Sequence, residues 1–140
     1  MDEYKKILVP VDESNQSYAA LKEAVAIAQR NKAHLYILTV TDMSIATVDA
    51  RLIQYAKEVS EENATRTLDK AAQIVADEVS YTTRKIEGSA KVDIVQFAEE
   101  TEIDLIVMGA TGKNAIERLL IGSTTSYVIN YAPCNVMVVR

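Results

Sequence analysis

Apolar residues along the chain gather in short runs separated by longer amphipathic stretches. Four runs are rich in β-branched residues and hardly alternate with polar ones: residues 7–11, 35–40, 105–108 and 136–139. Strands that are buried on both faces, as in a parallel sheet covered by helices, have this pattern. A weaker, alternating segment at residues 81–86 predicts a fifth strand nearer an edge of the sheet.

The stretches between these runs show the spacing of amphipathic helices. They cover residues 17–31, about 49–79, about 91–100, and the segment from Gly122 to Pro133, where a proline stops the helix. Ser14 or Asn15 can cap the first of these helices. The second is long for one helix, and we expect a bend in its polar part, residues 60–67.

The same spacing predicts which helical side chains face the core. In the second helix the apolar face comprises Leu52, Tyr55, Ala56, Val59, Leu68, Ala71, Ala72, Val75 and Val79. In the third it comprises Val92, Val95, Phe97 and Ala98. Because strands and helices alternate and crossovers are right-handed, we expect an α/β fold with a doubly wound, open, Rossmann-like parallel sheet and helices on both faces. Residues 1–140 are expected to form a single domain, with residues 42–48 as its most mobile loop.

Composition and charge narrow the functional class. The chain has 140 residues, 49% of them hydrophobic, and a formal net charge of −5. This charge argues against nucleic acid and anionic membranes as partners, although a local basic pocket for phosphate stays possible. The apolar stretch near the start is too short for a secretory or membrane segment, so we expect a cytoplasmic protein. Cys134 and His34, the single cysteine and histidine, are expected to be structural residues and not a zinc site or a nucleophile.

Candidate chemistry lies after the fourth predicted strand, since open α/β sheets bind ligands at the carboxyl ends of their strands. Three of the four glycines follow this strand: Gly109, Gly112 and Gly122. Glycines let a ligand approach the backbone closely. Gly122 and the hydroxyl residues Ser123 and Thr124 open the last predicted helix, whose free N–H groups and dipole favour an anion. The segment therefore predicts a polyphosphate cradle, although Ser123 and Thr124 could serve only as a helix cap.

The spacing of these glycines differs from two common nucleotide motifs. A Walker A loop has four residues between its glycines, whereas two intervene here and Asn114 follows Lys113. A dinucleotide fingerprint follows the first strand and not the fourth. Instead, Gly109-x2-Gly112-x9-Gly122-Ser123 resembles the G-x2-G-x9-G-[S/T] pattern of ATP-binding universal stress proteins. Pro10-Val11-Asp12 and residues 132–139 are also similar to that family.

This resemblance implies a five-stranded parallel sheet, for which we expect the strand order 3-2-1-4-5. It also implies bound ATP and a homodimer formed through the last strand, residues 136–139. Members of the family that lack the glycine pattern resemble the founding type, which does not bind ATP. This chain keeps every glycine of the pattern and is therefore expected to bind ATP.

Further nucleotide contacts are expected at strand ends and in the glycine segment: Pro10, Val11, Asp12, Val40, Met108 and Lys113. Asp12 could hold Mg²⁺ or contact the ribose or adenine, or it could help to cap the first helix. Val40 and Met108 could enclose the adenine or be plain core. Lys113 and Arg118 could offset phosphate charge or be ordinary exposed cations.

The sequence thus predicts an ATP-binding, nucleotide-dependent regulator in the stress response. No nucleophile–base pair and no charge clamp stand out, so any ATP hydrolysis should be slow. Three alternatives stay open: an ATPase or phosphotransferase that uses Asp12 as its base, a dimeric interaction protein with an empty pocket, and a related fold such as an electron-transfer flavoprotein domain.

Overall fold

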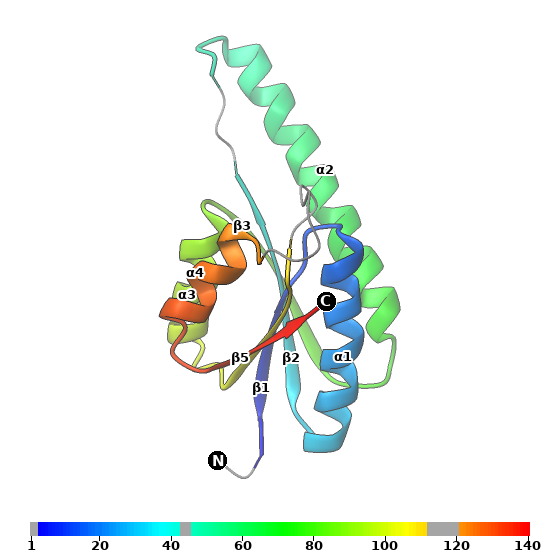
Figure 1. The fold of residues 1–140 in the computed structure, drawn as a ribbon. Coiled ribbons are helices and arrows are strands. Elements are labelled where there is room, and N and C mark those ends of the chain that lie inside the picture. Colours follow the sequence, from blue (N-terminus) through cyan, green and yellow to red (C-terminus); the bar gives the residue numbers. More distant parts are fainter. Residues whose placement is uncertain (1–2, 43–45, 112–120) are drawn as a thin grey trace.

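The computed structural model describes residues 3–42, 46–111 and 121–140. Five strands form one all-parallel sheet in the order β3-β2-β1-β4-β5, which confirms the predicted topology (Figure 1). The strands are β1 (Lys6–Pro10), β2 (His34–Thr41), β3 (Tyr81–Glu87), β4 (Leu105–Gly109) and β5 (Asn135–Val139). The helices are α1 (Asn15–Asn31), α2 (Ala50–Val75), α3 (Ala90–Glu100) and α4 (Ser123–Tyr131).

Helices cover both faces of the sheet, as predicted (Figure 1). On one face α1 and α2 enclose a core that includes Ile7, Val9 and Leu68. On the other, α3 and α4 enclose a second core that includes Leu8 and Ile106. Because β1 is central and covered on both faces, its apolar residues do not alternate with polar ones.

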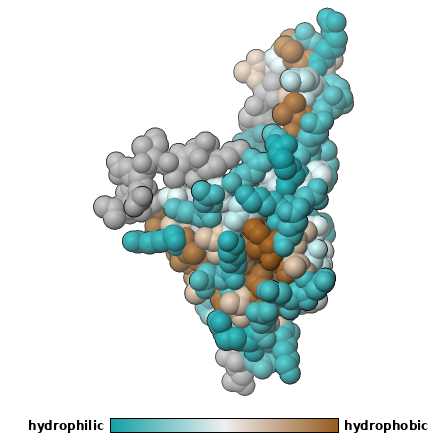
Figure 2. Space-filling model, turned by 90° about the vertical axis from the view of Figure 1, so that its right-hand side faces the viewer, coloured by the Kyte–Doolittle hydropathy of each residue, from teal (hydrophilic) through white to brown (hydrophobic). Residues whose placement is uncertain are grey.

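Helix α2 corrects part of the sequence prediction. It begins after its N-cap, Asp49, and runs through residues 60–67 to Val75 as one continuous helix. Its buried residues all lie in the second half: Ala64, Thr67, Leu68, Ala71 and Val75. Leu52, Tyr55 and Val59, predicted to face the core, are 54%, 66% and 37% exposed. The reason is visible in Figure 1, where the first half of α2 extends beyond the sheet and has no core to face. In Figure 2 this projecting part is mostly hydrophilic, with separate apolar spots.

Strand β3 agrees with its prediction, whereas helix α3 differs from it in part. Strand β3 lies at a sheet edge, as its weak alternation predicted, and most of its side chains are exposed. In α3, Val92 is exposed and Ile94, absent from the predicted face, is buried. The β2–α2 connection includes residues 43–45, which lie outside the described residues. No helix in the described ranges is long and apolar enough to cross a membrane.

Candidate functional site

The switch point of the sheet lies between β1 and β4. Their ladder pairs only Ile7 with Leu105 and Leu8 with Ile106, although β1 continues to Pro10 beside β2. The Val11 N–H donates to the Leu38 carbonyl at 2.9 Å. Because successive residues of a strand turn their N–H groups to opposite sides, the Pro10 nitrogen faces β4, where it has no hydrogen to donate. Pro10 thus ends the ladder at the place where open α/β sheets bind ligands.

The turn from β1 into α1 is fixed by short polar side chains. The Asp12 carboxylate accepts the Ser14 N–H at 3.1 Å, and the Ser14 hydroxyl accepts the Ser17 N–H at 3.1 Å. Ser14 is therefore the N-cap, one of the two predicted candidates. The Ser17 hydroxyl accepts the Asp12 N–H at 3.2 Å. Asp12 supports the cap through Oδ1, and within the described part of the chain Oδ2 has no hydrogen-bond partner.

The end of β4 is tied to the start of α4. The Gly122 N–H donates to the Ala110 carbonyl at 2.8 Å, and the Thr125 hydroxyl donates to the Gly109 carbonyl at 2.9 Å. Ala110 in turn donates its N–H to the Val139 carbonyl of β5 at 2.9 Å. These bonds hold the first turn of α4 directly beside the carboxyl end of the sheet.

That first turn begins with N–H groups that the helix itself does not use. Gly122 is the N-cap and makes no side-chain cap bond. The first helical hydrogen bond runs from the Ser126 N–H to the Gly122 carbonyl at 2.9 Å. The N–H groups of Ser123 and Thr124 precede that bond and have no acceptor within the helix. Together with the helix dipole, they give this end of α4 a positive potential suited to an anion.

Gly109 has a packing role that the sequence did not reveal. A Cβ on this residue would lie 3.0 Å from the Cβ of Gln16 and 3.1 Å from its carbonyl carbon. The missing side chain therefore lets the first turn of α1 approach the end of β4. Gln16 was not predicted as a site residue, because its partner there, Thr111, lies 95 positions away and no local motif links the two.

The predicted adenine contacts lie on both faces of the sheet. Met108 is 4% exposed and belongs to the core under α3 and α4, against which half-buried Val40 also packs. Val11 belongs instead to the core under α1 and α2. Val40 and Met108 therefore lie on the same face of the sheet, where both could flank one adenine ring. The Val11 side chain lies on the other face.

Three predicted contacts, Gly112, Lys113 and Arg118, lie outside the described residues. Elsewhere, the ring nitrogens of His34 lie 2.8 Å from the hydroxyl oxygens of Ser80 and Thr82. His34 thus joins β2 to β3 at an end of the sheet remote from the switch point.

Cys134 has the properties of a packed thiol. Burial, followed by the negative charge of Asp104, raises the pKa of Cys134 to about 11. The thiol is therefore protonated at neutral pH, and a protonated thiol is a poor nucleophile. In the ranges 3–42, 46–111 and 121–140, no three His, Cys, Asp or Glu side chains gather as a metal site.

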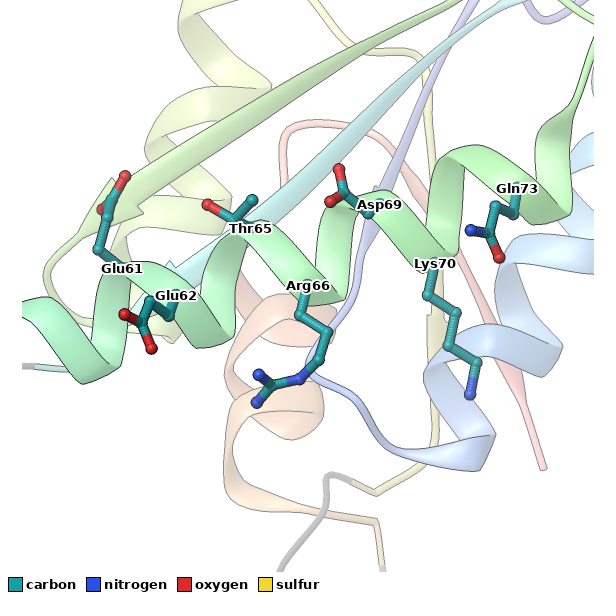
Figure 3. Close-up of a pocket in the computed structure, with 7 residues that line it drawn as sticks. All are labelled: Glu61, Glu62, Thr65, Arg66, Asp69, Lys70 and Gln73. Atoms are coloured by element: carbon teal, nitrogen blue, oxygen red, sulfur yellow. The ribbon is translucent and has the colours of Figure 1, made fainter.

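A separate hollow of about 510 Å³ lies along α2. Its lining is Glu61, Glu62, Thr65, Arg66, Asp69, Lys70 and Gln73, all exposed and all from one helix (Figure 3). Figure 3 shows that Arg66 and Lys70 point away from Glu61 and Asp69, so opposite charges do not converge on one point. Arg66 contacts Glu13 at 3.7 Å, and the Lys70 ammonium lies 4.5 Å from the centre of the Tyr18 ring. The charged groups of Arg66 and Lys70 therefore already have partners within the protein. These surface contacts do not indicate a ligand-binding site.

Comparison with known proteins agrees with this geometry. The sequence model of the universal stress protein family matches residues 3–140. A universal stress protein of Methanocaldococcus jannaschii is 37% identical over 140 residues, covering 98% of this chain and 82% of that protein. The solved structure of universal stress protein UspA from Lactobacillus plantarum is 41% identical, covers 100% of both chains and superposes with a TM-score of 0.91.

Two more distant structures carry nucleotides. A universal stress protein from Archaeoglobus fulgidus, solved with dAMP, is 23% identical with a TM-score of 0.75, and the match covers 98% of each chain. Another, solved with cAMP, is 24% identical with a TM-score of 0.76, and the match covers 99% of each chain. At these identities the likeness shows a shared fold, and the nucleotides are properties of those two proteins. Since the family model spans nearly its whole length and relatives reach 37–41% identity, the chain belongs to the universal stress protein family.

Proposed function

We propose that this protein binds an adenine nucleotide, ATP with Mg²⁺, at the carboxyl ends of β1 and β4, and that binding regulates its interactions in the stress response. One observation carries the proposal: the first N–H groups of α4, which have no acceptor within the helix, are fixed beside β4, next to the point where Pro10 ends the β1–β4 ladder. A phosphate chain at this helix start and a base over the strand ends would fill the ligand position of an open α/β sheet.

Each predicted residue has a role in this arrangement. The backbone of Ser123 and Thr124, with Gly112 and Lys113, would hold the phosphates. Val40 and Met108 would flank the adenine, beside Pro10 and Val11 at the end of β1. Mg²⁺ is usually held by substrate phosphates together with one or two carboxylates. Asp12 suits this role because one oxygen fixes the turn and the other has no partner among the described residues.

Regulation is favoured over rapid catalysis. The described residues around the switch point hold no histidine, and the pKa of Cys134 is raised, which leaves Asp12 as the candidate base. Turnover should therefore fall far below the ~1–100 s⁻¹ of kinases. Steady hydrolysis in that range, abolished in Asp12→Ala, would favour the enzyme alternative.

Homodimerisation through β5 is part of the proposal. This strand forms an edge of the sheet, and its Met137 is 41% exposed. Tyr131 and Ile129 of the adjoining α4 are 61% and 44% exposed. An uncovered edge strand beside exposed apolar side chains is a surface on which a second copy can pair.

The phosphate cradle is tested by Gly112→Val and thermal denaturation. A ligand that binds only the folded state stabilises it by about 2.7 kcal/mol at a hundredfold excess over Kd. At this size, that corresponds to a Tm rise of roughly 5–10 °C. Nucleotide-stripped wild type should show this rise with excess Mg-ATP. Gly112→Val should keep its circular dichroism spectrum and lose most of the rise, because a branched side chain blocks phosphate approach. An equal rise of Tm in the variant would contradict the assignment of the phosphate cradle. The alternative of an interaction protein with an empty pocket would then be favoured.

A further inference from the structure

The projecting half of α2 carries an apolar stripe that the fold leaves uncovered. Leu52, Tyr55 and Val59 are all exposed, and their spacing of three and four residues places them on one side of the helix. The buried residues of α2, such as Leu68 and Ala71, lie on a different side. At about 100° per residue, the two sides are separated by roughly 140° around the helix axis. The stripe is therefore not a continuation of the core-facing side.

Charged residues border this stripe in a defined pattern. Leu52 and Val59 are seven residues apart with Tyr55 between them, which is the spacing of the apolar positions in a coiled-coil seam. Arg51 and Glu58 directly precede Leu52 and Val59, and both are exposed along the same border of the seam. Among the described residues, neither of these charged groups makes an ion pair. One border of the seam thus has a positive end and a negative end, both without a charged partner in this part of the chain.

We propose that the apolar stripe of α2 binds the same stripe of a second copy of the chain, with the two helices antiparallel. A two-fold axis near residues 53–54 would pack Leu52 of each copy against the partner's Tyr55. The same axis would bring Arg51 beside the partner's Glu58 and, by symmetry, Glu58 beside the partner's Arg51. The exposed stripe and its unmatched charges would then be satisfied together.

The charges select the antiparallel direction. In a parallel coiled coil, the border positions of Arg51 and Glu58 would face the partner's Ala56 and the partner's Asn63, which carry no charge. Only the antiparallel arrangement sets opposite charges beside each other. It also suits the shape of the molecule, because the first half of α2 extends beyond the sheet and the two domains would lie at opposite ends of the pair (Figure 1).

This contact goes beyond the proposed function and uses a surface that shares no residue with β5. Three apolar side chains and two charged ones from each copy make less than a standard interface, and small interfaces are transient. We expect a dissociation constant of about 0.1–1 mM. The pair is then dissociated at the micromolar concentrations used for chromatography and spectroscopy.

The test is sedimentation equilibrium of the full chain from roughly 10 µM to 1 mM, a range that spans the expected dissociation constant. All samples carry Met137→Lys, because a charge on the β5 edge opposes pairing through that strand. We expect reversible dimers whose fraction rises with concentration. Leu52→Lys should abolish this rise, since it places a charge inside the seam.

Charge reversal tests the direction of pairing. Arg51→Glu replaces two opposite-charge contacts by two like-charge contacts and should weaken association about tenfold. Lys57→Glu is the matched control: it makes the same charge change at an exposed residue on the other side of the same helix, and should have no effect. The double variant Arg51→Glu/Glu58→Arg exchanges the two signs and should recover the affinity of the parent protein.

Three results would overturn the inference: a mass that does not rise with concentration up to the millimolar range, equal weakening by Arg51→Glu and Lys57→Glu, or a double variant no stronger than Arg51→Glu. Circular dichroism of each variant should match that of the parent, because the substituted side chains are exposed. Nucleotide titration of the same proteins separates this inference from the proposed function. Failure to bind Mg-ATP would remove that function and leave pairing through α2 unaffected.

Discussion

At the scale of single residues, four non-glycine positions among the described residues turn the chain with positive φ: Glu13, Lys32, Ala76 and Glu102. Lys32 has left-handed geometry at the end of α1, which is a common way for a helix to stop. Ala76, at the end of α2, has φ 50° and ψ −132°, a conformation that side chains with a Cβ rarely adopt. Alanine is strained at this position and glycine would not be.

This strain predicts opposite effects for one substitution at two neighbouring positions. Ala76→Gly should raise the free energy of unfolding by up to about 1 kcal/mol because it relieves the strain of the positive φ at this residue. Ala72→Gly, inside α2, should lower it by about 1 kcal/mol because glycine is a poor helix former. Urea denaturation of both variants measures the difference. A loss of stability in both would contradict the observed conformation of Ala76.

The site was predictable where its chemistry is local in sequence. The cap at Ser14 and the strand-end position of Asp12 each follow from a few adjacent residues. Gln16 was missed because its role depends on Thr111, which only the folded sheet brings near. Likewise, the sequence marks Gly109 as a member of a pattern, but only the structure shows that α1 packs against it.

At the scale of elements, α2 shows how a helix can be amphipathic without being buried along its length. Leu68 lies in the half that packs on the sheet and is 8% exposed, whereas Leu52 lies in the projecting half and is 54% exposed. Both occupy apolar positions of the same helical pattern. Their environments differ because the sheet ends beneath the middle of the helix (Figure 1).

Truncation of the two leucines should therefore have unequal effects. Leu68→Ala removes buried methyl groups and should cost about 2–4 kcal/mol of unfolding free energy. Leu52→Ala should change it by no more than about 0.5 kcal/mol, the usual range for a surface substitution. Chemical denaturation followed by circular dichroism gives both values. Comparable losses would mean that the first half of α2 is packed in solution.

The strands were easier to predict than the faces of the helices. A strand buried on both sides leaves a continuous apolar run, so β1, β2 and β4 are evident in the sequence. Their order in space followed from a resemblance to a family and not from these runs. Which part of α2 is covered depends on where the sheet ends, and the local sequence of the helix does not predict the position of that end.

At the scale of the whole molecule, an uncovered β5 predicts assembly of two copies. Met137→Lys places a charge on the exposed side of this edge strand, a substitution that opposes edge pairing. The variant should stay folded and elute as a monomer. Val92→Lys, at a residue of similar exposure on α3, should leave assembly unchanged. Light scattering after size exclusion decides the matter, and dimeric Met137→Lys would exclude pairing through β5.

The most direct test of the central claim is calorimetric titration of nucleotide-stripped protein with Mg-ATP. We predict saturable binding of one ATP per chain, because each chain has one α4 start fixed at its switch point. GTP should bind more weakly, since the backbone near Val40 would read the edge of the adenine. Absence of saturable binding at millimolar ATP would contradict the proposed function.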